Sequence, residues 1–313
     1  MQKQREHQVV WESYWRARRQ SLQNPSGKRQ AVIAAFQTIE GLAAESARPV
    51  RIIELGCGEG HILGELLKMC ETSKLAVGDC AGVDNQERVI ESARRLYPQV
   101  NFSVADYAKQ PLNLQPFDLV MMVGTLHEVY SGSCPGALGE IDPELGKKAV
   151  AKALGHGALL VGVDRYLVLF DGVEHPLPGL QIVVRFNSAR AIDEFKKIVS
   201  EYEAFRLSYE EAQGRRRVKI SMRDFTRYIT KTRFFNSGLW EIEKWESYQY
   251  FTEDEFKKCL GEIGIDVLKL QCSTPRQKDW DDRVTIETPG VAFPQENILI
   301  VGRKTRKISV RRD

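Results

Sequence analysis

Glycines at alternate positions make residues 54–60, Glu54-Leu55-Gly56-Cys57-Gly58-Glu59-Gly60, the most informative segment of the chain. Glycine is required where the backbone dihedral φ is positive or where the backbone must approach a ligand closely. An apolar, β-branched run (50–55) precedes the segment, and a helical pattern (62–70) follows it. Because a helix N-terminus offers free N–H groups, this arrangement predicts a strand, turn and helix that hold a cofactor.

Two kinds of cofactor use this geometry. The dinucleotide fingerprint G-x-G-x-x-G needs glycine at its sixth position, where this chain has His61. An acid, Glu54, also ends the strand, and its carboxylate would repel a pyrophosphate but suit a cationic amino group. The residues therefore favour a cofactor that carries an amino group. We expect Cys57 to pack with its backbone near the ligand, without thiol chemistry.

The segment ELGCGEG resembles the first motif of the class I S-adenosylmethionine-dependent methyltransferases, an acid followed by glycines at the spacing GxGxG. The resemblance extends in order through residues 50–164 and implies S-adenosylmethionine as the cofactor. The cofactor-binding residues that it implies are Glu54, Gly56, Cys57, Gly58, Gly60, Asp84, Asn85, Asp106, Tyr107 and Gly124.

The resemblance also implies roles for the acids that follow the next two strands. Asp84 would hold the ribose hydroxyls, and Asp106 with Tyr107 would bracket the adenine. Each has a structural alternative, because Asp84 could cap the following helix and Asp106 could be a turn residue. The glycines themselves could form a simple tight turn.

The fourth predicted strand, 117–127, leads into the expected methyl-transfer centre. Methyl transfer from a sulfonium is an in-line displacement that requires alignment and exclusion of water, while a base is optional. We expect His127 and Glu128 to be catalytic and Thr125 to line the substrate site. His127 could act as a general base or could pack beneath the loop. Glu128 could orient an amine or hydroxyl or could be solvated.

Aromatic residues elsewhere are further candidates. In many small-molecule members of the family, a tyrosine from an N-terminal helix folds over the cofactor, and Tyr14 in the predicted helix 9–19 could do so here. Trp240 and Trp245 lie in the segment 165–250 and could line a pocket for a flat or cationic substrate. In both cases the alternative is ordinary packing of a helix or of a core.

The order of elements predicts an α/β fold. Short apolar runs alternate with helical patterns, which indicates a Rossmann-like, seven-stranded, mostly parallel sheet with helices on both faces, plus N-terminal helices and an inserted helical cap. The resemblance implies that the last strand is antiparallel. The predicted strands are 50–55, 80–84, 101–106, 117–127, 157–164, 265–272 and 297–303. The predicted units are an N-terminal cap (1–45), the cofactor-binding core (46–164), the inserted lid (165–250), the end of the core (251–304) and a basic tail (305–313).

Composition excludes several classes of protein. The 313 residues are 42% hydrophobic and 28% charged with a net charge of +3, which neither requires nor excludes a nucleic-acid partner. We expect no membrane span and no secretory signal, because no apolar stretch is long enough. Six scattered cysteines form no disulfide or zinc pattern, so a cytoplasmic protein with reduced thiols and without a metal site is the simplest interpretation.

Three functions remain open. The favoured one is methylation of an oxygen, nitrogen or carbon of a small organic acceptor enclosed by the 165–250 segment. Methylation of RNA or protein is an alternative, because basic clusters at 215–219 and 303–312 could contact phosphates or could be solvated surface. A non-catalytic protein that binds the cofactor or its demethylated product is the third. The sequence does not specify the acceptor or the oligomeric state.

Overall fold

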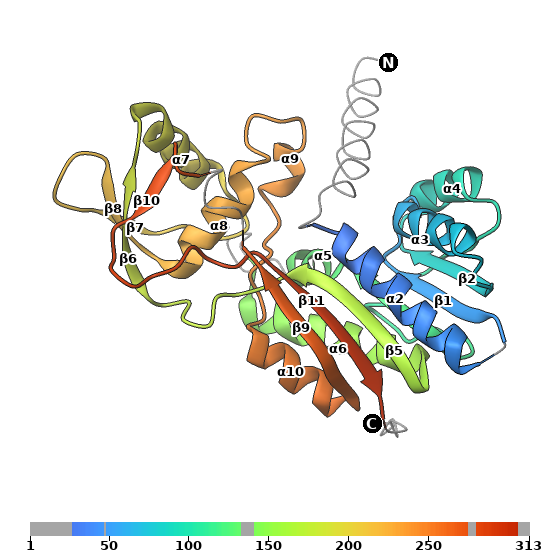
Figure 1. Cartoon of the computed structure of the whole chain (residues 1–313). Coiled ribbons are helices and arrows are strands. Elements are labelled where there is room, and N and C mark those ends of the chain that lie inside the picture. Colours follow the sequence, from blue (N-terminus) through green and yellow to red (C-terminus); the bar gives the residue numbers. More distant parts are fainter. Residues whose placement is uncertain (1–26, 47, 133–140, 275–279, 306–313) are drawn as a thin grey trace, which may run out of the picture.

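The computed structural model describes residues 27–46, 48–132, 141–274 and 280–305. Its centre is a seven-stranded sheet in the order β3-β2-β1-β4-β5-β11-β9 (Figure 1). The strands are β1 (Val50–Leu55), β2 (Val77–Asp84), β3 (Asn101–Val104), β4 (Phe117–Val123), β5 (Val161–Gly172), β9 (Ile265–Ser273) and β11 (Asn297–Lys304). Strands β1 to β5 pair in parallel, whereas β11 pairs antiparallel with both β5 and β9. The predicted seven-stranded, mostly parallel sheet with an antiparallel last strand is confirmed, whereas the predicted helix 9–19 lies outside the described residues.

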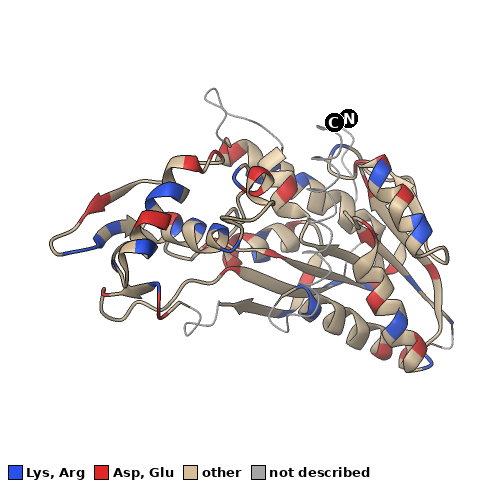
Figure 2. Cartoon of the chain, turned by 90° about the horizontal axis from the view of Figure 1, so that it is seen from above, with Lys and Arg blue, Asp and Glu red and all other residues tan. Residues whose placement is uncertain are grey.

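Helices cover both faces of this sheet. They are α2 (Arg29–Glu45), α3 (His61–Thr72), α4 (Glu87–Leu96), α5 (Leu126–Gly132), α6 (Pro143–Leu160) and α10 (Glu253–Glu262). Seen from above, Lys and Arg are mixed with Asp and Glu along the outer sides of the helices (Figure 2). None of the helices in the described ranges is both long and apolar enough to cross a membrane.

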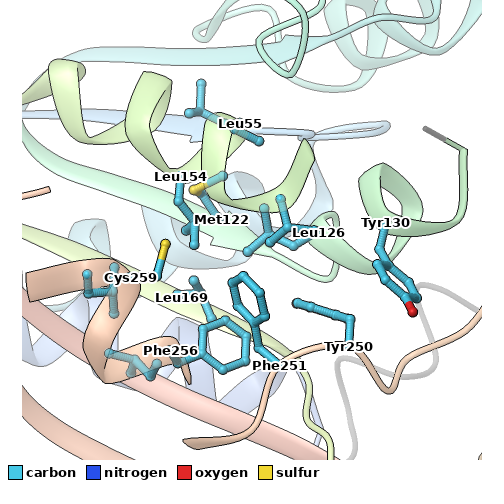
Figure 3. Close-up of a cluster of buried hydrophobic side chains, with 14 of the residues drawn as sticks. Leu55, Met122, Leu126, Tyr130, Leu154, Leu169, Tyr250, Phe251, Phe256 and Cys259 are labelled. Carbon is cyan, nitrogen blue, oxygen red and sulfur yellow. The ribbon is translucent and has the colours of Figure 1, made fainter. Parts of the chain in front are cut away.

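Strand β4 shows why the sheet needs both layers. All of its residues are buried, and successive side chains point to opposite faces. Leu119 and Met121 pack with α2 and α3, whereas Val120 and Met122 pack with α6 and α10. Figure 3 shows Met122 beside Leu154 of α6 within the second of these clusters. A continuous apolar run is therefore the pattern of a strand that is covered twice.

The boundary between α6 and β5 corrects one prediction. Residues 157–160, predicted to begin the fifth strand, are the last turn of α6, and β5 continues to Gly172 rather than ending at 164. Gly157, Ala158 and Leu160 extend the buried side of the helix, so the apolar run fits a helix as well as a strand. The chain therefore leaves the main sheet after residue 172, not at the predicted boundary of 165.

The segment 173–250, called the insertion below, is not only helical as predicted. Its elements are β6 (Gln181–Phe186), α7 (Ala189–Glu201), β7 (Tyr209–Glu211), β8 (Arg217–Ser221), α8 (Met222–Thr232) and α9 (Trp240–Glu243). The strands form a second, antiparallel sheet in the order β10-β6-β8-β7, in which β10 (Val284–Ile286) comes from the connection between β9 and β11. Ile182, Val184 and Phe186 alternate along β6 and are buried with the residues of α7 and α8, which explains the strand.

Candidate cofactor and acceptor site

The glycine turn joins β1 to α3. Gly56, Gly58 and Gly60 have φ values of +71°, +53° and +77°, all in the left-handed region. A Cβ atom on Gly56 would lie 2.0 Å from Oγ1 of Thr125, so this position also requires the absence of a side chain. The turn therefore lies directly against the segment that follows β4.

Asp84, at the end of β2, holds the glycine turn in place. Its Oδ2 accepts a hydrogen bond from the Gly58 N–H (3.0 Å), and its Oδ1 accepts one from the Gln86 N–H (3.0 Å). The carboxylate thus contacts both the glycine turn, beside the predicted cofactor site, and the backbone just before α4. Asn85, next in the chain, is exposed.

Glu54 is an acid buried beneath the turn. Its side chain is 1% exposed, and its Oε2 has no hydrogen-bond partner in the described part of the chain. Burial raises the pKa of this carboxyl well above its ordinary value, and the nearby Lys28 opposes that rise. An unpaired buried carboxylate oxygen is costly, so the site fits a ligand that brings a cationic amino group. S-adenosylmethionine carries such a group.

Asp106 and Tyr107, predicted to bracket the adenine, follow β3 and make different contacts. Oδ1 of Asp106 accepts hydrogen bonds from the N–H groups of Ala108 and Lys109, which is the geometry of a turn residue. The Tyr107 side chain is buried, and its hydroxyl lies 3.0 Å from Oγ1 of Thr125. Tyr107 therefore reaches the segment after β4 from inside the core.

A residue that the sequence analysis missed, Asp171, organises the segment after β4. Its Oδ2 accepts hydrogen bonds from the N–H groups of Thr125 (2.9 Å) and Leu126 (2.8 Å). Its Oδ1 accepts from Nδ1 of His127 (2.8 Å) and from the Gly172 N–H (2.7 Å). The available signal was an acid followed directly by glycine at the end of an apolar run, residues 167–172. The predicted strand stopped at 164, so Asp171 fell outside it.

Burial and the interaction between His127 and Asp171 together determine the pKa values of these two side chains. Burial alone would lower the pKa of His127, but Asp171, Glu246 and Glu128 together raise it above its ordinary value. Burial alone would raise the pKa of Asp171, but His127 and the N–H groups of Gly172 and Leu126 hold it below its usual range. Asp171 is therefore a carboxylate at neutral pH.

The insertion covers His127. The Tyr248 ring stacks on the imidazole with centroids 4.0 Å apart and 20° between the planes. Oε2 of Glu246 lies 3.9 Å from His127 Nε2, a buried atom with no hydrogen-bond partner among residues that the structure describes. Burial and the nearby Glu243 and Glu128 raise the pKa of Glu246 to about 7. The site after β4 is thus closed by acidic and aromatic residues of the insertion.

The other predicted residues lie as follows. Trp240 is buried in the core of the insertion and its indole N–H donates to Glu201 (2.7 Å), so it stabilises the insertion, as the alternative held. Trp245 is 48% exposed. Gly124 has a φ of +63°, and a Cβ there would meet Lys28. Tyr14 lies outside the described residues. No group of His, Cys, Asp and Glu suited to a metal ion occurs in the described ranges.

The chain is similar to known methyltransferases in one part of its sequence and in its fold. A family model described as a methyltransferase domain matches residues 52–145, which run from β1 to the start of α6. No curated protein matches the chain. The chain is similar to a solved TehB-like SAM-dependent methyltransferase from Corynebacterium glutamicum (15% identity, 95% of this chain and 98% of that chain covered, TM-score 0.45). It is also similar to a SAM-dependent methyltransferase from Mesorhizobium loti (18% identity, 85% and 97% covered, TM-score 0.46).

Proposed function

We propose that this chain, whose residues 52–145 match a methyltransferase-domain model, transfers a methyl group from S-adenosylmethionine to an oxygen, nitrogen or carbon of a small organic acceptor. The acceptor would be held between the segment after β4 and the insertion. The observation that carries this proposal is the burial of His127, which faces Glu246 and Tyr248 of the insertion. An enclosed reaction centre favours a small acceptor over a polymer.

The residues divide into a cofactor side and an acceptor side. Glu54 would receive the amino group of S-adenosylmethionine through the glycine turn, and Asp84 would hold the ribose. Asp106 and Tyr107 would lie toward the adenine. The cofactor supplies a methyl group that is already activated by its positively charged sulfur. The protein must align the acceptor with that methyl group and exclude water, and His127 and Glu128 would face the acceptor.

The described basic residues support a small acceptor over RNA. Arg217 forms an ion pair with Glu287 (2.8 Å), and Lys219 lies 3.7 Å from Glu210. Figure 2 shows acidic residues among the basic ones in the insertion. Because Arg217 and Lys219 are paired with carboxylates, the cluster has less free positive charge for phosphates.

Calorimetric titration with S-adenosylmethionine, S-adenosylhomocysteine and NAD tests the cofactor. We expect micromolar dissociation constants for the first two and no binding of NAD. The variant Glu54→Gln should bind more weakly, because an amide attracts an amino group less than a carboxylate does. Glu65→Gln is the matched control, since Glu65 lies on α3 and pairs with Arg29.

Transfer of a radiolabelled methyl group then tests the acceptor. The enzyme is offered pools of small metabolites, total RNA and total protein in parallel. Label in the small-molecule pool supports the proposal, while label in RNA or protein would overturn the acceptor class. Cofactor binding without transfer to any pool would leave only the binding function.

A further inference from the structure

Asp171 has a fully occupied carboxylate. Its two oxygens accept four hydrogen bonds, from the N–H groups of Thr125, Leu126 and Gly172 and from the imidazole of His127. A carboxylate offers about four acceptor positions and, when ionised, no donor. Nδ1 of His127 must therefore carry the hydrogen in its contact with Asp171. In the neutral imidazole the lone pair is then on Nε2.

The ring of His127 cannot turn away from this arrangement. Its Nδ1 is bound at 2.8 Å to Asp171, and Tyr248 stacks on its face at 4.0 Å. Nε2, at the opposite end of the ring, is buried and lacks a hydrogen-bond partner in the ranges that the structure describes. A buried nitrogen with a free lone pair is costly unless a ligand occupies it.

Glu246 faces Nε2 from the insertion. The separation of 3.9 Å is too long for a hydrogen bond between the two groups. An oxygen or nitrogen atom at ordinary hydrogen-bond distance from both Nε2 and the Glu246 carboxylate would form an angle of roughly 90° with them. One hydroxyl or amine group can therefore contact both side chains. The position between these two side chains is therefore suited to the nucleophile of an acceptor.

Other charged groups surround this position. Glu128, which follows His127 on α5, raises the pKa of both His127 and Glu246. Behind the Tyr248 ring, Lys231 of α8 lies 4.5 Å from the ring centroid and forms an ion pair with Glu243 of α9 (2.8 Å). Acidic groups thus predominate around Nε2, which favours the positive charge that His127 gains when it accepts a proton.

We propose that Asp171 is the positioning residue that keeps Nε2 of His127 as a proton acceptor, and that Glu246 closes this proton-accepting site from the insertion. The acceptor is then a molecule whose methylated atom carries a hydrogen, such as a hydroxyl or an amine. The lone pair of that atom forms the bond to the methyl carbon, and the carbon–sulfur electron pair returns to sulfur. The hydrogen leaves as a proton to Nε2. This inference rests on the proposed function, because the proton comes from the acceptor of the proposed methyl transfer.

Nitrogen NMR of the histidine side chains tests the tautomer without any acceptor. Two histidines are internal references, because Nδ1 of His156 donates to the Tyr107 carbonyl (2.7 Å), whereas Nδ1 of His175 accepts from the Leu177 N–H (3.0 Å). At high pH, His127 should show the Nδ1–H pattern of His156. A pattern like that of His175 would overturn the proposal.

The variant Asp171→Asn provides the decisive comparison. Its amide oxygen should face the N–H groups of Thr125 and Leu126, which turns the amide N–H₂ toward Nδ1 of His127. The imidazole should then adopt the Nε2–H form, while His156 stays unchanged. An unaltered His127 signal in a folded variant would refute the assignment.

A second variant covers the case in which Asp171→Asn does not fold. Glu246→Gln should lower the pKa of His127 and leave its tautomer unchanged, whereas Glu241→Gln, on the exposed side of α9, should do neither. A His127 pKa that is the same in Glu246→Gln and in the parent chain would show that Glu246 does not act on Nε2.

Turnover with an acceptor found by the methyl-transfer screen separates positioning from stability. Asp171→Asn should lower kcat by about a hundredfold or more, the scale of general-base catalysis, and leave the dissociation constant of S-adenosylhomocysteine unchanged. In the parent chain, turnover should rise as the pH passes through the raised pKa of His127. A preferred acceptor with no hydrogen on its nucleophile would contradict the inference, whereas failure of cofactor binding would contradict the proposed function instead.

Discussion

Replacement of Gly56 by alanine tests the packing of the glycine turn against the segment after β4. The new Cβ would lie 2.0 Å from Oγ1 and 2.6 Å from Cβ of Thr125, far inside the van der Waals separation. Thr125 has little freedom to move, because its N–H is bound to Asp171 and its hydroxyl lies 3.0 Å from the Tyr107 hydroxyl. Alanine would also have to adopt a φ of +71°.

The two effects can be added. A left-handed conformation costs an L-residue roughly 1–2 kcal/mol, and overpacking of a core costs roughly 1–3 kcal/mol. We therefore expect Gly56→Ala to lower the free energy of unfolding by about 2–5 kcal/mol. Urea denaturation at pH 7 measures this loss. Gly41→Ala in α2 is the control, because in the described chain a Cβ there would meet nothing within 4 Å apart from its chain neighbours and the backbone of its own helix. It should gain about 0.5–1 kcal/mol.

Double variants separate the steric part from the backbone part. Thr125→Ala removes the Oγ1 contact at 2.0 Å but keeps the Cβ contact at 2.6 Å, so it should relieve the overpacking only in part, whereas Thr125→Gly removes both contacts and should recover the whole overpacking portion. The reasoning would be refuted if Gly56→Ala were as stable as Gly41→Ala, or if the two Thr125 changes relieved it equally. Titration with S-adenosylhomocysteine should show weaker binding wherever the turn is displaced.

Three other expectations follow from the same contacts. Asp84→Asn should weaken S-adenosylhomocysteine binding by about 1–3 kcal/mol in calorimetry. Asp79→Asn, at an exposed position of β2, should not weaken it. Equal affinities of the two variants would show that Asp84 does not bind the cofactor. Gly172→Ala would place a Cβ 2.1 Å from the Tyr248 carbonyl oxygen, so it should weaken the His127–Tyr248 stack, seen as a changed His127 ring-proton shift. The pKa of Glu246 is raised from 4.5 to about 7, so its protonated form stabilises the fold below pH 4.5, and this contribution is lost as the pH rises through 7. Glu246→Gln should therefore be more stable than the parent chain by about 1–3 kcal/mol at pH 8 and no more stable at pH 4, as urea titrations at both pH values can check.

The sequence predicted the strand, glycine turn and helix at residues 50–72 well, because local signals determine them. Strand β1 begins and ends at the predicted residues 50 and 55, and α3 begins one residue before the predicted start. An apolar strand, a turn that needs glycine and a helix are each encoded within a few residues. The acid at the end of β2 was likewise recognisable from its place after a strand.

The surroundings of His127 could not be predicted to the same extent, because they depend on contacts between distant segments. Asp171 acts through residues about 45 positions away, and Glu246 and Tyr248 reach His127 from the insertion. Trp240 could not be assigned for the same reason, because a cluster of aromatic residues in the sequence is compatible both with a ligand pocket and with a packed core. Strand β10 is three residues long and exists only through its pairing with β6.

The second sheet has a consequence for the order in which the chain can fold. Strand β10 pairs with β6. Next to this pairing, Arg185 donates a hydrogen bond to Glu287, which lies 102 residues away in sequence. During synthesis, the insertion must wait for β9 to be made before its edge strand exists, so its completion is a late, high-contact-order event. A fragment that stops at residue 250 would leave β6 as an uncovered edge that is open to association with other chains. The insertion is therefore not a removable module, and any attempt to graft it elsewhere must carry β10 along.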